Sequence, residues 1–251
     1  MVISRLDNSK ELLALKEAGR VNDTIRQQAI EITRVGVSTL EIDTFINKQI
    51  LESGMKVSFK GVDGYKFSSC ININEGVLHG IPSKNCIVED GDIVTIDMGV
   101  NYKGLHTDTS WTFGVGKISK STQRFLDIGE ETLFMAIDEC NVGARIGDIA
   151  STIQRNIERN GYNVIREFVG HGVGYELHED PQIPCAGKAN TGLLIKNGMV
   201  LAIEVMYTQG SSQIVLTNDG WTYNTKDGKL AGMFEHTIVV TDSGPVVLTS
   251  K

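Results

Sequence analysis

The chain has 251 residues, 41% of them hydrophobic, and a formal net charge of −7, which fits a globular protein of one large domain or two small ones. Its Lys and Arg residues form no basic run, so no specific nucleic-acid partner is expected. No run approaches membrane-spanning length and the first residues hold no apolar signal core, so we expect a cytoplasmic protein without a membrane partner.

Two helices are predicted at the beginning of the chain. Apolar residues recur at helical spacing from about Ser9 to Thr33, and a Val-Gly pair then ends the helix. Ser38 with Glu41 three residues later is typical of a capping box, so a second helix should begin there. Gly54 should end this second helix.

The segment 91–110 predicts a β-hairpin. An apolar, β-branched run is followed by turn residues at 101–104 and a return strand. A turn centred in the middle of that tetrapeptide places Asp97 directly opposite Asp108, with both carboxylates on one face. A metal cation between them would relieve their repulsion and the cost of burying Asp97. The alternatives are a strand slipped by one residue or two carboxylates facing water.

An internal repeat relates the two halves of the chain. Gly91-Asp-Ile-Val-Thr-Ile-Asp97 recurs as Gly198-Met-Val-Leu-Ala-Ile-Glu204, an offset of 107 positions, and the apolar face of the second helix recurs at the same offset. We therefore expect two similar helix-helix-strand halves, roughly 10–115 and 120–245, packed about a pseudo-twofold. They should form a single domain over 1–251, because neither half buries a core alone.

Four acidic residues interrupt apolar strands: Asp97, Asp108, Glu204 and Glu235. They cannot all stay ionised in a core without cations. His171 stands between glycines, which leave its ring accessible. Four carboxylates and one imidazole could hold two divalent ions at the spacing of about 3.5–4 Å used in two-metal hydrolysis. Such an oxygen-rich set suits Mn, Fe(II) or Co as well as Zn.

Other chemistry has less support. His106 and His236 each lie within two residues of one of these acids, and we expect structural roles for both. No Gly-x-Ser-x-Gly motif and no phosphate-binding loop is present. The four cysteines are widely spaced along the chain: Cys70, Cys86, Cys140 and Cys185. This spacing predicts reduced thiols rather than a zinc site or disulfides.

The motifs around these residues resemble the type I methionine aminopeptidases, the short bacterial form, over nearly the whole chain. The matching segments are Asn-Glu-Gly-Val-Leu-His79-Gly-Ile-Pro, Ile-Asp97-Met-Gly with Asp108, Gly-His171-Gly-Val-Gly, His178-Glu-Asp-Pro, Ala-Ile-Glu204 and Glu235-His-Thr-Ile-Val-Val-Thr. The resemblance implies an α+β pita-bread (creatinase/aminopeptidase) fold, with two pseudo-symmetric halves around a curved antiparallel sheet. Prolidase and aminopeptidase P share this fold but usually carry an extra N-terminal domain, which we do not expect here.

The resemblance also implies a dinuclear site for Co, Mn, Fe(II) or Zn. Asp97 would bind one metal, and Asp108 and Glu235 would bridge both. His171 and Glu204 would complete the second site. A metal-bridging hydroxide would then attack the scissile carbonyl while Glu204 moves the proton.

Further residues are implied to contact the substrate. His79 and His178 would bind the substrate and the tetrahedral intermediate. Tyr65, Cys70, Trp221 and Phe59 match positions of the methionine side-chain pocket. Four residues depart from the usual family pattern and leave the strictness for methionine open: Phe59, Val62, Leu177 and Val205.

The resemblance predicts a metal-dependent hydrolase that removes initiator methionine from nascent chains with a small second residue. It allows association with the ribosome, and nothing in the sequence predicts an oligomer, so a monomer is expected. Two alternatives stay open. One is an aminopeptidase of the same fold with another specificity, such as Xaa-Pro peptides. The other is a non-catalytic relative that binds peptide, protein or RNA.

Overall fold

The computed structural model describes residues 9–250, which form an α+β structure with antiparallel strand pairing throughout. The elements in chain order are α1 (Ser9–Ile32), α2 (Thr39–Glu52), β1 (Lys56–Val57), the 3₁₀ turn η1 (Val62–Gly64), β2 (Ser69–Ile73), β3 (Gly76–Leu78), β4 (Ile93–Tyr102), β5 (Leu105–Gly114), α3 (Lys120–Asp138), α4 (Ile146–Arg159), β6 (Asn163–Val164), β7 (Val169–Gly172), β8 (Glu179–Pro184), β9 (Val200–Thr208), β10 (Ile214–Leu216), β11 (Tyr223–Thr225), β12 (Ala231–Thr241) and β13 (Gly244–Val247).

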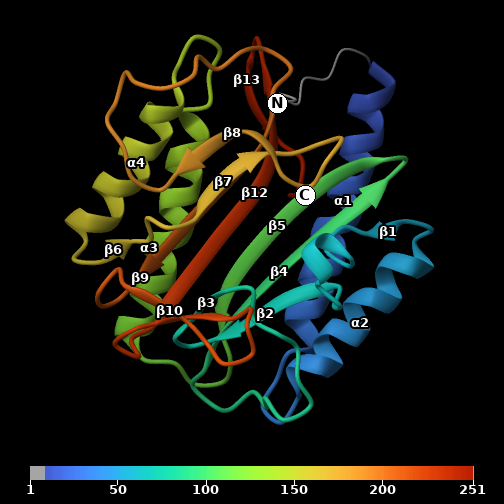
Figure 1. Cartoon of the computed structure of the whole chain (residues 1–251), viewed down its shortest axis with the longest axis vertical. Helices are drawn as coiled ribbons and strands as arrows, with labels where there is room; N and C mark the ends of the chain where they lie inside the picture. Colours follow the sequence, from blue (N-terminus) through green and yellow to red (C-terminus); the bar gives the residue numbers. More distant parts are fainter. Residues whose placement is uncertain (1–8, 251) are drawn as a thin grey trace.

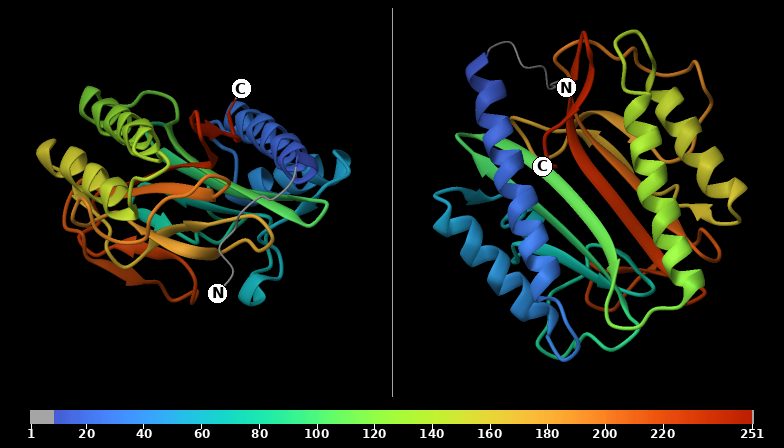
Figure 2. Two further views of the ribbon diagram at one scale, coloured as in Figure 1. Left: turned by 90° about the horizontal axis from the view of Figure 1, so that it is seen from above. Right: turned by 180° about the vertical axis from the view of Figure 1, so that it is seen from behind.

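A ten-stranded sheet forms the centre of the molecule, with the main path β1-β4-β5-β12-β9-β7-β8 (Figure 1). The α-helices of the described chain cover one face of this sheet, with α1 and α3 in the middle and α2 and α4 outside them (Figure 2). A small sheet, β10-β11-β3, lies on the side away from the helices. No helix within residues 9–250 has the length and apolarity to cross a membrane.

The two predicted N-terminal helices are confirmed. Helix α1 spans Ser9–Ile32, and Ser38 caps α2 with its side chain accepting from the Glu41 N–H, while the Glu41 carboxylate accepts from the Ser38 N–H at 2.9 Å. This reciprocal pair is the predicted capping box. All four cysteines are free thiols, and only Cys86 is exposed.

The internal repeat recurs in three dimensions with the predicted offset. Helix α2 (Thr39–Glu52) corresponds to α4 (Ile146–Arg159), and the β1–β4 pairing Lys56↔Asn101 corresponds to the β6–β9 pairing Asn163↔Thr208. Even the isolated bridge Ser38↔Ile87 has a counterpart, Arg145↔Leu194. The two halves therefore share this helix, this strand pairing and this bridge at one constant offset.

The predicted register of the β4–β5 hairpin is wrong by two residues. Asp97 pairs with Ser110, and Asp108 pairs with Gly99. The turn is centred on Lys103-Gly104, whose φ angles of 55° and 83° match the two-residue turn that suits the twist of a hairpin. Because a shift of two preserves which face a side chain occupies, the two carboxylates still share a face, as diagonal rather than directly opposed neighbours.

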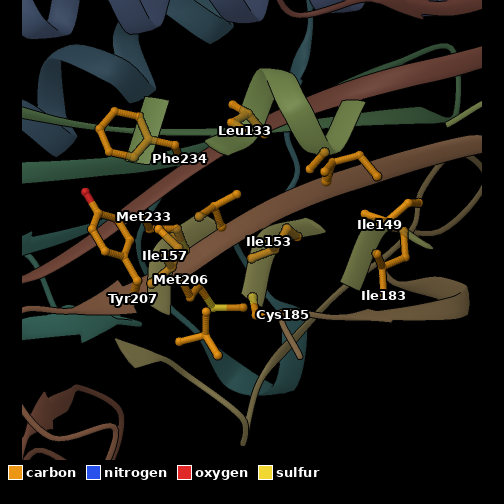
Figure 3. Packing of buried hydrophobic residues seen from close by; sticks show 14 of the residues in the cluster. Leu133, Ile149, Ile153, Ile157, Ile183, Cys185, Met206, Tyr207, Met233 and Phe234 are labelled. Atoms are coloured by element: carbon orange, nitrogen blue, oxygen red, sulfur yellow. The ribbon is translucent and has the colours of Figure 1, made fainter. Parts of the chain in front are cut away.

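The largest core lies between the sheet and helices α3 and α4 (Figure 3). The α4 residues Ile149, Ile153 and Ile157 are completely buried there, on one helical stripe. Helix α4 packs against α3, β6 and β8, while α3 packs against β9 and β12, which add the buried Tyr207 and Phe234 to the same core. A separate cluster packs α1 and α2 against β4 in the first half. With the helices filling one face, the opposite face of the central strands is left for polar side chains.

Candidate metal centre

One row of side chains crosses the four central strands in register. Asp97 on β4 pairs with Ser110 on β5, Ser110 pairs with Glu235 on β12, and Glu235 pairs with Glu204 on β9. Directly opposed residues in an antiparallel ladder lie on the same face, close enough for like charges to repel. The row therefore places three carboxylates on one face, drawn from both halves of the chain.

Asp108 and His171 complete the cluster from positions beside this row. Asp108 lies two residues before Ser110 on β5, and its Oδ1 accepts a hydrogen bond of 3.0 Å from the Thr109 N–H. His171 on β7 pairs with Ala202, two residues before Glu204 on β9. Its Nε2 lies 3.3 Å from a Glu204 carboxylate oxygen. All five predicted ligands are therefore brought together.

The backbone fixes the orientation of the His171 ring. Nδ1 lies 2.9 Å from the Gly172 carbonyl oxygen, which acts as an acceptor and so places the proton on Nδ1. Nε2 then faces the Glu204 carboxylate, where its lone pair could bind a cation in place of a proton. The flanking glycines serve backbone packing more than ring access, since a Cβ on Gly172 would lie 2.2 Å from the Asp180 carbonyl oxygen and one on Gly170 2.6 Å from that of Ala202.

Potential ligand atoms group into overlapping sets of three. In each set the atoms lie within 4.8 Å of one another: Asp97, Asp108 and Glu235; His171, Glu204 and Glu235; and Asp108, His171 and His178. Asp108, His171 and Glu235 each belong to two sets. The sets Asp97/Asp108/Glu235 and His171/Glu204/Glu235 share Glu235, as two neighbouring cations with a common carboxylate ligand would need.

Burial and mutual repulsion make this cluster costly without cations. Burial, with Asp108 and Glu204 nearby, holds the pKa of both Asp97 and Glu235 well above the ordinary value. Burial and the Glu204 charge, partly offset by His171, raise the pKa of Asp108 to about 7. Burial alone would lower the pKa of His171, but the Glu204 carboxylate outweighs it and raises that pKa. A divalent cation would reverse these preferences and keep the carboxylates ionised.

The donor set fits divalent metal ions. Glu235 is 1% exposed, and its Oε1 has no hydrogen-bond partner within the described structure. An unpaired buried carboxylate oxygen is expensive, so such a group normally has a ligand. Carboxylates and one imidazole, with no thiolate among them, suit Mn, Fe(II), Co and Zn.

The cluster lies in a cavity of about 390 Å³. Every residue that the sequence placed at the site lines it: Phe59, Tyr65, Cys70, His79, Asp97, Asp108, His171, His178, Glu204, Trp221 and Glu235. Val62 and Leu177 line it as well. Phe59, Tyr65, Cys70 and Leu177 form a buried apolar cluster, with Trp221 packed on Tyr65 at a ring distance of 5.1 Å. The Tyr65 hydroxyl donates to the Ser69 carbonyl at 2.9 Å, so the ring is fixed in this wall.

Two further histidines border the cavity. His79 has a φ of 55°, a rare backbone conformation outside glycine, and its ring meets Phe168 edge to face at 5.7 Å. Burial lowers its pKa. Partial desolvation, together with the nearby His171, His79 and His106, lowers the pKa of His178 to about 4. Its ring lies 4.6 Å from that of His171. Both shifts favour the neutral imidazole.

His106 and His236 lie outside this cavity, as expected. The His106 ring forms hydrogen bonds with Asn101 and Ser58, and the His236 ring with Thr249. Sequence reasoning missed Phe168 and Gln182, which line the cavity. No local signal marks them, because Phe168 reaches His79 only through contact between the two halves of the chain.

Comparison with known proteins gives a consistent result. Residues 14–242 match the model of metallopeptidase family M24. The chain is 42% identical over 240 residues to methionine aminopeptidase 1 of Bacillus subtilis, covering 96% of each chain. The crystal structure of methionine aminopeptidase from Thermotoga maritima superposes with a TM-score of 0.97 at 38% identity, covering 100% of both chains.

A more distant structure shares the fold. The prolidase of Pyrococcus horikoshii has a TM-score of 0.80 at 22% identity, and the match covers 99% of this chain and 64% of that one. The predicted pita-bread fold is thus confirmed. With the family model matched over residues 14–242 and a carboxylate–imidazole cluster suited to metal, the chain belongs to metallopeptidase family M24.

Proposed function

We propose that the chain is a metal-dependent methionine aminopeptidase that removes the initiator methionine from nascent proteins with a small second residue. The observation that carries the proposal is the pair of ligand sets sharing Glu235, which opens onto an apolar pocket. The full-length similarity to enzymes named methionine aminopeptidase supports the same conclusion.

We assign five residues to two divalent ions. Asp97 would hold one ion, His171 and Glu204 the other, and Asp108 and Glu235 both. When bound, the ions would polarise the scissile carbonyl, lower the pKa of water and stabilise the developing oxyanion. The Gly172 carbonyl orients His171 for this role by holding its Nδ1 proton. Co, Mn, Fe(II) and Zn all suit the donor set.

The apolar wall would receive the methionine side chain. Phe59, Tyr65, Cys70 and Trp221 border a space beside Asp97, and Cys70 pairs with Asp97 across β2 and β4. A substrate whose first side chain occupies the space bordered by this wall would therefore place its amino group near the Asp97 carboxylate. The ammonium would gain a charge-assisted hydrogen bond only if the peptide has a free N-terminus, which is the selectivity of an aminopeptidase.

Three residues would handle hydrogen bonds and protons during the reaction. Burial lowers the pKa of His79 and of His178 and so favours the neutral imidazole, from which each would donate one N–H to a substrate carbonyl or to the oxyanion. Glu204, beside His171, would accept a proton from the attacking water and pass it to the leaving amine.

The assignment requires both halves of the chain in one catalytic domain. Asp97 and Asp108 come from the first half, and His171, Glu204 and Glu235 from the second. We further propose that the enzyme acts as a monomer in the cytoplasm on the N-terminal Met of nascent chains. Contact with the ribosome is compatible with that role.

The pocket residues Val62 and Leu177 favour one competing function, an aminopeptidase of the same chemistry with another specificity. A direct test is hydrolysis of Met-Ala-Ser by chelator-treated protein supplied separately with Co, Mn, Fe(II) or Zn. Gly-Pro-Ala and Leu-Ala-Ser serve as competing substrates. We expect metal-dependent cleavage of the Met peptide alone. Preferential cleavage of another peptide would assign the enzyme a different substrate. No cleavage with any of the metals would refute the proposed enzymatic activity.

A further inference from the structure

Strand β12 changes partners at Thr237, next to the candidate metal centre. On one edge, Glu235 and His236 pair with β5, whereas Ile238 and the following residues pair with β13. β5 and β12, which join the two halves of the chain, have only these two paired positions. Backbone groups of β5 beyond them need other partners.

The Thr237 hydroxyl is the partner of both backbone groups of Asp108. It accepts a hydrogen bond of 2.8 Å from the Asp108 N–H and donates one of 2.7 Å to the Asp108 carbonyl oxygen. Thr237 and Asp108 are 0% and 4% exposed, so no water can readily replace this hydroxyl. One side chain on β12 thus holds the backbone of a proposed metal ligand on β5.

Thr237 is itself held from the C-terminal segment. Its N–H donates to the Thr249 hydroxyl at 3.1 Å, and its carbonyl accepts from the Leu248 N–H at 2.8 Å. Its backbone also pairs with Ala202 on β9. The hydroxyl therefore has a fixed position from which to set the separation of β5 and β12.

We infer that Thr237 is a positioning residue that sets Asp108 at the correct distance from Glu235 for both to contact two cations. The inference rests on the proposed function, because the metal assignment of both carboxylates does. The strand separation matters because Asp108 and Glu235 are on different strands and different halves. A hydroxyl inserted between the strands keeps them wider apart than a direct ladder hydrogen bond would.

A second threonine provides a matched control. The Thr112 hydroxyl forms the same two bonds across the other end of these two strands, to the Met233 N–H and carbonyl, both at 2.8 Å. Thr112 is also buried. Met233 carries no proposed metal ligand, so losing the Thr112 hydroxyl should weaken the contact between the strands without displacing Asp108.

The test compares Thr237→Val, Thr237→Ser and Thr112→Val with wild type. Valine keeps the shape of threonine and removes the hydroxyl, whereas serine keeps the hydroxyl. Affinity for Mn²⁺ is measured by titration calorimetry on chelator-treated protein. Visible absorption of bound Co²⁺ reports the number and geometry of the ligands. Circular dichroism verifies folding, and Thr237→Ala replaces the valine variant if that one does not fold.

We expect Thr237→Val to weaken Mn²⁺ binding by about 10- to 100-fold, the usual effect of losing a group that orients a metal ligand. Its Co²⁺ spectrum should change, while Thr237→Ser and Thr112→Val keep the wild-type affinity and spectrum. Equal affinities for Thr237→Val and Thr112→Val would overturn the inference, as would a serine variant that fails like valine. Wild type that binds no metal would instead refute the proposed function, so the two failures are distinguishable.

Discussion

Replacing Asp108 with Asn should stabilise the metal-free protein at alkaline pH and abolish metal binding. Asp108 has a pKa of about 7 in the folded protein, raised first by burial and then by Glu204. An aspartate in an unfolded chain has a pKa of about 3.9, so the difference of about three units corresponds to about 4 kcal/mol at pH 8. Asparagine has the same shape, and its Oδ1 can still accept from the Thr109 N–H.

The sign of the pH dependence follows from the raised pKa. The folded state binds the Asp108 proton more tightly than the unfolded state, so this group favours folding below about pH 4. That contribution is lost as the pH rises through the folded pKa of about 7. The wild-type protein without metal should lose this stability between pH 4 and pH 8, and the Asn variant should not.

Urea denaturation of chelator-treated protein at pH 5 and pH 8 measures this difference. Integrating the proton-binding difference from pH 5 to pH 8 gives the size of the effect. Asp108→Asn should raise the free energy of unfolding by about 2–3 kcal/mol more at pH 8 than at pH 5. Asp127→Asn, an exposed change on α3, serves as the control. Added Mn²⁺ should stabilise wild type only. A gain that is the same at both pH values would refute the electrostatic reasoning.

Three further predictions address the ligands, the pocket and the fold. His171→Ala should abolish metal-dependent hydrolysis of Met-Ala-Ser while circular dichroism stays unchanged; full activity would exclude His171 as a ligand. Leu177→Ala, which removes part of the apolar wall, should lower kcat/KM for the Met peptide at least about tenfold with little effect on Mn²⁺ affinity. Gly104→Ala, at a φ of 83°, should lower the free energy of unfolding by about 1 kcal/mol or more, and an unchanged urea midpoint would contradict the assigned turn.

Local patterns in the sequence were enough to predict several parts of the fold. The helical spacing of apolar residues and the Ser38–Glu41 capping box located α1 and α2, because both signals act within a few residues. The recurrence of the Asp97 segment at Glu204 located equivalent strands in the two halves. Acids within apolar strands identified the candidate ligands, because a buried charge needs a partner.

Strand register was beyond the sequence alone. The hairpin between β4 and β5 could turn on either of two neighbouring residue pairs, and choosing the wrong pair misplaced Asp108 by two positions. The observed turn uses Lys103-Gly104, since the positive φ angles of this turn type suit glycine. The predicted face of each carboxylate was nevertheless correct, because side chains along a strand alternate between the two faces with a period of two.

The sequence by itself determined the residue types of the site, their strands and the faces they occupy, because these depend on local periodicity and on the cost of buried charge. Only the tertiary structure decided how the two halves meet. The in-register row from Asp97 to Glu204, the contact of Phe168 with His79 and the Thr237 bridge to Asp108 all join segments far apart in the chain. Such contacts arise from packing between elements, and no spacing along a single chain encodes them.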